Sequence, residues 1–303
     1  MLLERTIPVG YIWQSARRDF LVVFGISVAG ALLVEYERAF LPDLPVTIAA
    51  FLGTAISLIL SFKLNQTYDR WWEARKVWGA IVNDSRTLVR QALAFTSGAP
   101  DAEGEVDRMV RRLARRQIAW CHCLGQTLRG QDWRTYTDKY VEEADIAELE
   151  RNDNRPVALL LQQARSLAAL ADRGALTDYQ RVALDDTLTR LTDSMGRAER
   201  IRNTVFPKTY RMFLKAFIYV FITVLSISLG EVEGYWEIVV TTAISTPFLL
   251  LERTSRQMQD PFANRPTDTP VTAIARAIEI NILQLLGNEK VPDPFPPDTF
   301  YQM

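Results

Sequence analysis

The sequence predicts an all-α membrane protein with four membrane-spanning helices and a large helical cytosolic region. Three observations carry this prediction. Four apolar segments occur in two pairs, the charges flanking them are distributed asymmetrically, and the charged segments between and after the pairs have helical periodicity without β-alternation. Composition alone, with 48% apolar and 23% charged residues, would also suit a soluble protein. The prediction therefore depends on where the apolar residues lie.

The apolar segments are long enough to suggest membrane helices. They cover residues 20–34 and 45–62 in the first pair, and 216–230 and 235–251 in the second. At ~1.5 Å per residue, the run 45–62 reaches about 27 Å, which is close to the ~30 Å core of a bilayer. The predicted membrane helices cover about 20–41, 45–62, 213–230 and 235–251. The alternative interpretation is a set of buried helices in a large soluble core.

The flanking charges favour the membrane interpretation. The link 35–44 contains one basic residue, Arg38, and the link 231–234 contains none. Every opposite end is basic, through Arg17, Arg18, Lys63, Arg70, Arg75, Lys76, Lys208, Arg211, Lys215, Arg253 and Arg256. This is the positive-inside pattern for four crossings of a cell membrane with both termini in the cytoplasm. Residues 63–212 and 252–303 are then cytosolic, and the whole chain 1–303 forms one unit.

The cytosolic segments show amphipathic helical patterns. The expected helices cover 66–97, 105–129, 155–171, 177–203 and 271–287. The sequence "LTD" at 176–178 is a suitable helix cap. The tail from Val291 is rich in proline and is expected to be an extended arm.

The stretch "NQTYDRWWEARKVWG" at 65–79 follows directly on the second apolar run. If the membrane helix continues through it, Trp71, Arg75 and Trp78 share one face, and the guanidinium can lie between the two indoles. This predicts a rigid structural collar where the helix leaves the membrane. The alternative is an ordinary interfacial belt of aromatic and basic side chains.

The helix before this stretch has two distinct faces. Its small residues are Ala50, Gly53, Ser57 and Ser61, which would allow a neighbouring helix to approach closely. Thr54, Leu58 and Phe62 repeat every four residues beside them. A helix with these faces can line a constriction, although ordinary helix packing would explain the same pattern.

Several parts of the chain together resemble the bestrophin family, in its bacterial form. These are Phe62 with "NQTYDRWWEARKVWG", the paired spans around a helical insert, and the C-terminal "DPFANRPTDTPVTAIARAIEINILQLLG". The resemblance covers essentially the whole chain. It implies a homopentameric ion channel with one central pore, four membrane helices in each subunit, and a location in a bacterial inner membrane.

The resemblance also implies which residues line the pore. Phe62 matches the family's neck phenylalanine, and counting back by four places Leu58 and Thr54 in the same hydrophobic neck. A shorter match places Tyr179 at a second, cytosolic aperture. Both Thr54 and Tyr179 depart from the aliphatic residues usual in the family. A hydroxyl in the neck could make it easier to wet, since hydrophobic constrictions gate by dewetting.

No metal or cofactor site is expected. The segment matching the family's calcium clasp offers only Asp260, Asn264 and Asp268, a poor cage for an ion that needs six to eight oxygens. A capped loop is the better interpretation of that segment. The sequence "CHC" at 121–123 is expected to pack in the core, because adjacent residues on a helix diverge by about 100°. The basic cluster of Arg108, Arg111, Arg112, Arg115 and Arg116 is expected to form a solvated or intersubunit face.

The predicted function is a channel for small monovalent ions, with anions, chloride above all, favoured on family grounds. Its expected partners are other copies of the chain, the lipid bilayer and the permeating ions. A net charge of −1 gives no field for nucleic acid, and no catalytic motif indicates an enzyme. The alternatives are a cation-selective channel of the same fold, a membrane scaffold or receptor whose cytosolic helices bind a partner, and a four-span carrier.

Overall fold

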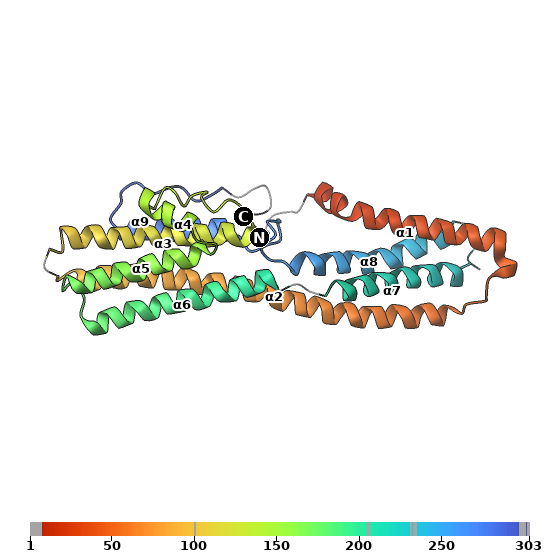
Figure 1. The fold of residues 1–303 in the computed structure, drawn as a ribbon. Coiled ribbons are helices and arrows are strands. Elements are labelled where there is room, and N and C mark those ends of the chain that lie inside the picture. The colour runs from red at the N-terminus through yellow and green to blue at the C-terminus, as the bar shows by residue number, and fades with distance from the viewer. Residues whose placement is uncertain are drawn as a thin grey trace. The chain divides into compact units, whose positions relative to one another are not determined.

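The computed structural model describes residues 8–99, 101–204, 207–230, 232, 235–296 and 301. All the regular secondary structure in these residues is helical, which confirms the predicted all-α class. The elements in chain order are α1 (Val9–Glu37), the 3₁₀ turn η1 (Arg38–Phe40), α2 (Val46–Thr96), α3 (Glu105–Arg129), α4 (Glu143–Glu150), α5 (Arg155–Asp172), α6 (Asp178–Asn203), α7 (Lys208–Ser228), α8 (Trp236–Met258) and α9 (Val271–Leu285) (Figure 1).

The chain divides into two compact units. The apolar unit consists of Glu4–Trp71 and Val205–Asp260, and the helical body consists chiefly of Trp72–Thr204 and Pro261–Met303. Helix α2 belongs to both, because it continues without interruption through the stretch of tryptophan and arginine. This continuity agrees with the expectation that the second apolar segment extends beyond Lys63 as a single helix.

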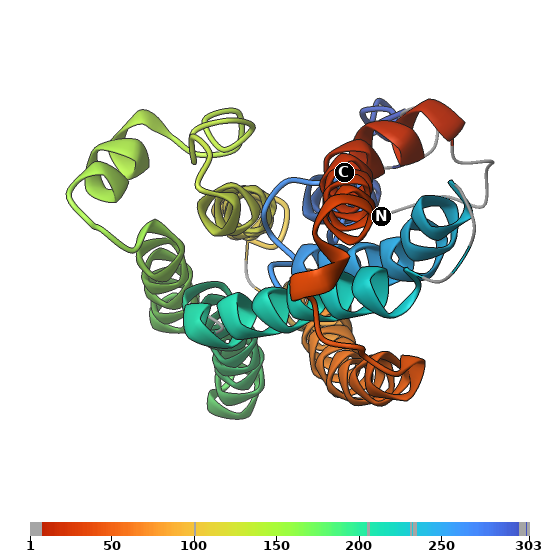
Figure 2. The ribbon, with the colours of Figure 1, turned by 90° about the vertical axis from the view of Figure 1, so that its right-hand side faces the viewer.

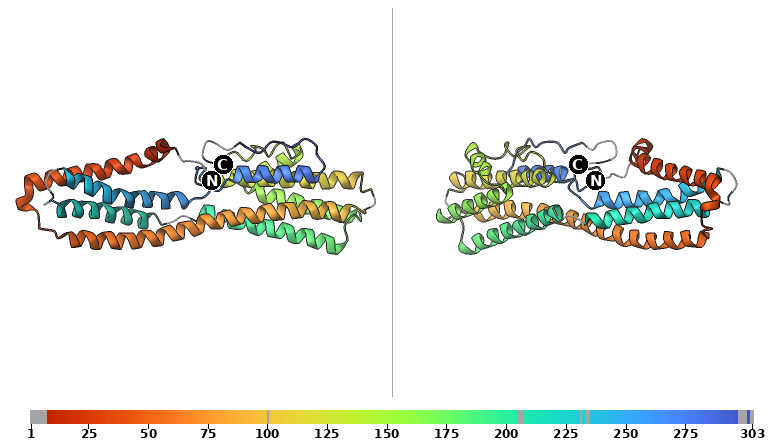
Figure 3. Two further views of the ribbon diagram at one scale, coloured as in Figure 1. Left: turned by 180° about the vertical axis from the view of Figure 1, so that it is seen from behind. Right: turned by 45° about the vertical axis from the view of Figure 1, so that its right-hand side comes forward.

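In the apolar unit, α1, α7 and α8 pack on one another and the first part of α2 lies beside them (Figures 2 and 3). The buried core is centred on α7, where the Phe221 ring meets Phe248 of α8 edge-on at 5.1 Å between centroids. Gly30 allows α1 to approach α7 closely, because a Cβ there would lie 2.2 Å from the Ser226 hydroxyl oxygen. Gly53 lets α2 approach the Phe221 ring in the same way.

Three described helices are long and apolar enough to cross a membrane: α1 from Gly10, α2 and α7. Helix α8 is not among them, because its uncharged run spans only 238–251, between Glu237 and Glu252. Pro247 lies inside α8 and the helix continues through it, as expected from the sequence. Helix α1 begins at Val9, well before the predicted start at residue 20, because the charged residues 17–19 continue the same helix.

The helical body is built around α3, which packs on α5 and α9, while α6 packs on α5 (Figure 1). Helix α3 has the predicted bounds, and most of its length is buried. Helix α6 begins with a capping box, in which the Thr177 hydroxyl accepts from the Gln180 N–H and the Gln180 side chain accepts from the Thr177 N–H. The predicted cap is confirmed. The short helix α4 was not predicted, since eight residues with few apolar positions give no periodic signal.

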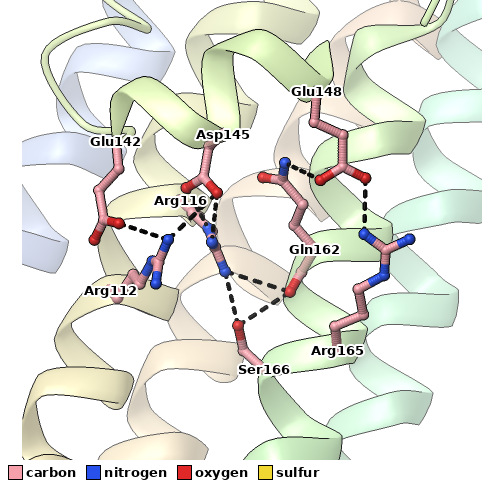
Figure 4. A network of polar contacts seen from close by, with 8 residues as sticks. All are labelled: Arg112, Arg116, Glu142, Asp145, Glu148, Gln162, Arg165 and Ser166. Atoms are coloured by element: carbon pink, nitrogen blue, oxygen red, sulfur yellow. Dashed lines mark hydrogen bonds and ion pairs between the residues drawn. The ribbon is translucent and has the colours of Figure 1, made fainter. Parts of the chain in front are cut away.

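The expectation that the α3 arginines form a solvated or intersubunit face is wrong for Arg116. This side chain is buried, and its guanidinium forms an ion pair with Asp145 of α4 at 2.7 Å (Figure 4). It also donates to the Ser166 hydroxyl of α5 at 2.8 Å. Helical spacing puts position 116 on the inner face of α3 with the buried Leu113 and Trp120, so the arginine must find its partners inside.

Candidate functional site

Helix α2 presents two opposite faces in the apolar unit. One face is buried, through Ala49, Ile56, Leu60, Lys63 and Thr67. The opposite face carries Thr54, Leu58 and Phe62, all of which are exposed in the single chain. Leu58 has 59% and Phe62 has 61% of its surface exposed. The three predicted neck residues thus form a continuous stripe on the side of α2 that faces away from the rest of its own unit.

A buried ion pair helps to set the direction of this stripe. The Lys63 ammonium lies 3.3 Å from the Glu252 carboxylate of α8, and both side chains are almost fully buried. Arg256 also contacts Glu252, at 3.4 Å. The sequence identifies Lys63 only as a basic charge that flanks the second apolar run, and the structure places it on the inner face of α2. Thr67 continues the contact one turn later, with its hydroxyl 3.4 Å from that of Ser255.

Sequence reasoning missed this pair, although a signal was present. Lys63 directly follows the second apolar run, and Glu252 directly follows the "FLLL" that ends the fourth. Opposite charges at the same predicted membrane level on two helices can pair across the bundle. A buried pair of this kind fixes the rotation of α2 against α8, since separating the charges would leave each unpaired in an apolar environment.

Thr54, the polar member of the stripe, has its hydroxyl occupied. Thr54 Oγ1 donates to the Ala50 carbonyl at 2.9 Å, and Ser57 Oγ donates to the Gly53 carbonyl at 2.8 Å. Such bonds to the preceding turn satisfy the hydroxyl hydrogen within the helix. Thr54 is thus less polar toward its surroundings than a free hydroxyl would be.

Tyr179, the predicted aperture residue, lies in the first turn of α6 in the helical body. Its side chain is 91% exposed, and Val182, one turn later on the same face, is also exposed. The capping box at Thr177 fixes where this helix begins, so the position of Tyr179 on the first turn is well defined. Several neighbours on this part of α6 are acidic, namely Asp178, Asp185 and Asp186.

The predicted collar lies where α2 passes from one unit to the other. Trp71 ends the apolar unit, and its ring lies 6.1 Å from that of Tyr68. Trp78 is fully buried in the core of the helical body, where its ring packs against Gly125 of α3. Arg75 lies on the turn between them. The stacking of Arg75 between the two indoles stays a prediction.

The residues at the clasp-like positions follow α8, and the boundary between the two units falls among them. Asp260 ends the apolar unit, whereas Asn264 and Asp268 belong to the helical body. Asp268 accepts a hydrogen bond from the Arg265 N–H at 2.9 Å, and Asn264 has a positive φ of 63°. Both features are those of a tight turn. Among the described residues there is no group of three or more His, Cys, Asp or Glu side chains suited to a metal ion.

The "CHC" segment packs in the core of the helical body, as predicted. Cys121 and Cys123 are buried, and burial raises the pKa of both thiols to about 12. His122 Nε2 lies 2.9 Å from the Glu279 carboxylate of α9, and the Tyr140 hydroxyl donates to the same carboxylate. Burial alone would raise the pKa of Glu279, but these hydrogen bonds and the charge of Arg276 lower it on balance.

Comparison with known proteins gives consistent matches along the chain. The family described as bacterial/fungal bestrophin protein matches residues 5–284. The voltage-dependent anion channel-forming protein YneE of Escherichia coli (strain K12) is 32% identical over 259 residues, which cover 85% of this chain and 83% of that protein. The voltage-dependent anion channel-forming protein mll4386 of Mesorhizobium japonicum is 31% identical over 287 residues, covering 92% and 88% respectively.

The fold matches as well. The crystal structure of a bacterial bestrophin homologue from Klebsiella pneumoniae is similar with a TM-score of 0.82 and 26% identity, over 89% of this chain and 98% of that chain. Sequence and fold agree over nearly the full length, and three apolar helices are long enough to cross a bilayer. The chain is a membrane protein that belongs to the bacterial/fungal bestrophin family.

Proposed function

We propose that the chain forms a homopentameric channel for small monovalent anions, chloride foremost, with a neck lined by Thr54, Leu58 and Phe62. The observation that carries this proposal is the exposed stripe on α2, opposite the face that Lys63 and Glu252 anchor. The family consists of channels, not enzymes, and the relatives are named as anion channel-forming proteins.

The composition of α2 supports both the assembly of several copies and the position of the neck. Its small residues Ala50, Ser57 and Ser61 lie beside the stripe and are exposed in the single chain, so a second copy of α2 can approach there. Five copies arranged in this way would turn Leu58 and Phe62 toward a common axis. A ring of such apolar side chains passes ions only when it is wetted, which makes its width the main control of flux.

The second constriction and the membrane topology complete the proposal. Tyr179 would form the cytosolic aperture, where five exposed phenol rings could narrow the exit.

Helix α8 would be the fourth crossing, packed on α1 and α7, which compensate for its short uncharged run. The basic flanks favour both termini in the cytoplasm of a bacterial inner membrane. Trp71, Arg75 and Trp78 would hold α2 rigid where it leaves the bilayer.

A cation-selective channel of the same fold is the second candidate. It is favoured by the acidic residues near Tyr179, namely Asp178, Asp185 and Asp186, because rings of carboxylates favour cations. Arg181 on the same turn partly offsets them. The neck itself bears no charge and does not distinguish the two candidates.

Ion flux through the purified protein in liposomes tests the proposal. Phe62→Ala should increase flux, because removing five phenyl rings widens the neck and makes it easier to wet. Phe217→Ala is the matched control, since Phe217 is a similarly exposed phenylalanine on α7 of the same unit. Equal flux in Phe62→Ala and the wild type would contradict the neck assignment. The reversal potential across a potassium chloride gradient gives the sign of the permeating ion.

A further inference from the structure

The helical body carries a pocket whose charged lining is entirely basic. It has a volume of about 500 Å³, and its charged residues are Arg115 of α3, Lys139 of the following segment and Lys290 beyond α9. Tyr140 and Asn288 line it too. No aspartate or glutamate is among the lining residues. We call it the Lys290 pocket.

The cations of the Lys290 pocket exceed the negative charge near it. Within the described chain, Arg115 and Lys290 have neither an ion pair nor a hydrogen-bond partner. Lys139 reaches the buried Glu279 carboxylate at 3.6 Å, but Arg276 pairs with the same oxygen atom at 3.0 Å. The single Glu279 carboxylate therefore offsets both Lys139 and Arg276. Arg115 and Lys290 add two further positive charges that no carboxylate offsets. Such an excess of positive charge at one pocket attracts anions.

A neighbouring pocket on the same body provides an internal comparison. It shares Arg115, Lys139 and Tyr140 with the Lys290 pocket and adds three further arginines of α3. Each of those three has an acidic partner: Arg108 pairs with Glu105 at 2.5 Å, Arg111 with Asp107 at 2.6 Å, and Arg112 with Glu142 at 2.6 Å. The arginines that belong to the neighbouring pocket alone are thus neutralised, whereas Lys290, which belongs to the Lys290 pocket alone, and Arg115, which the two pockets share, are not.

We infer that the Lys290 pocket binds an anion that bears a multivalent phosphate group. Three cations from separate segments suit a ligand with several charged oxygens better than a single halide ion. The planar guanidinium of Arg115 can donate two parallel hydrogen bonds to phosphate oxygens, and the lysines supply point charges. The amide of Asn288 is a further donor at the rim. The volume is sufficient for a phosphate or diphosphate group.

Tyr140 forms the floor of the pocket and is held in place by several contacts, which favours binding. The Tyr140 hydroxyl donates to the buried Glu279 carboxylate, which His122 and Arg276 also hold, and the Lys139 ammonium lies 5.0 Å from the centre of the Tyr140 ring. Lys139 is thereby placed over the floor before any ligand arrives, so less ordering is needed on binding. The inference does not depend on the proposed channel function.

Isothermal titration calorimetry of the full-length protein in neutral detergent, with inorganic pyrophosphate, tests this inference. We expect saturable binding that weakens as salt is added, since the site is open to solvent. Arg115→Gln and Lys290→Gln should each weaken binding about tenfold, the effect of losing one charge-assisted contact, and the double variant should abolish it. Arg108→Gln is the matched control, because its charge is already paired with Glu105, and its affinity should equal that of the wild type.

Two results would overturn the inference: no saturable binding to the wild type, or unchanged affinity in a double variant whose thermal unfolding midpoint equals that of the wild type. A second arm distinguishes the source of the phosphate. The same titration in nanodiscs of phosphatidylcholine, with and without phosphatidic acid, would show competition if a lipid headgroup occupies the pocket. Equal affinity in both nanodiscs would assign the pocket to a soluble phosphate compound.

Discussion

Arg116 and Asp145 are a pair of buried charges that are fully partnered in the helical body. Arg116 donates through Nε and Nη2 to the two oxygens of Asp145, at 2.9 and 2.7 Å, and its remaining nitrogen donates to Ser166 (Figure 4). Arg112 contacts the same carboxylate at 3.4 Å. A buried pair is not in itself strongly stabilising, but removing one partner leaves the other charge without compensation.

Asp145→Asn should therefore lower the free energy of unfolding of the helical body by about 3 kcal/mol, because Arg116 stays buried without a counter-charge. Thermal denaturation followed by circular dichroism would measure this. Glu105→Gln is the control, since it breaks an exposed pair with Arg108 whose loss should cost less than about 1 kcal/mol. A destabilisation by Asp145→Asn no larger than that of the control would contradict the account.

Glu279 should make stability depend on pH in the acid range. Its pKa in the folded chain lies below its ordinary value of 4.5. A carboxyl group of this kind stabilises the fold fully above about pH 4.5, and the stabilisation is lost as the pH falls through the lowered pKa of the folded state. Glu279→Gln removes the titrating group, so its thermal midpoint should fall less on acidification than that of the wild type. Parallel losses in the two proteins would contradict this.

At the scale of elements, α2 should tolerate substitution very differently on its two faces. Leu60→Ala removes a buried side chain and should lower the thermal unfolding midpoint, because a cavity replaces packing contacts. Leu58→Ala removes a side chain of the same size from the exposed face and should leave the midpoint of the detergent-solubilised subunit unchanged. Differential scanning fluorimetry compares the two directly. Equal destabilisation would mean that Leu58 is packed inside the subunit.

Helices with strong periodicity could be predicted from the sequence, and short or polar elements could not. The bounds of α3 and the capping of α6 follow from apolar spacing and from Thr177, which are local signals. Helix α4 has no such signal. The buried position of Arg116 depends on Asp145 of α4, so it could not be predicted without knowing that α4 forms there.

The candidate site was predicted to a similar extent. The spacing of Thr54, Leu58 and Phe62 was enough to group them on one face, and the structure adds that this face is exposed. The ion pair between Lys63 and Glu252 on the opposite face was missed. The two residues are far apart in sequence, and each also fits the role of a charge that flanks an apolar segment. Basic residues without an acidic partner, such as Arg115 and Lys290, can be identified only from a structure, because the ion pairs of the neighbouring residues must be known first.

At the scale of the whole molecule, the small residues beside the exposed stripe of α2 should contact other copies of the chain, and the stripe itself should face the pore. We predict a particle of five times the 34.5 kDa chain mass, measured by native mass spectrometry after release from detergent. Closed cyclic assembly buries the same contact surface in every subunit. A monomer without ion flux would instead favour a membrane scaffold or receptor.

The central claim, that the exposed stripe of α2 lines the conduction pathway, is tested most directly by chemical modification of cysteines placed on it. The native Cys121 and Cys123 are buried, with their thiol pKa raised to about 12, so they should not react in the folded protein. Leu58→Cys should react with a charged methanethiosulfonate reagent, and the current through reconstituted channels should change on modification.

Leu60→Cys, on the buried face of the same helix, should not react, and its current should stay the same. Mass spectrometry would confirm that the Leu58→Cys channel is labelled. If the labelled channel carries the same current as the unmodified one, the assignment of Thr54, Leu58 and Phe62 to the pore is contradicted.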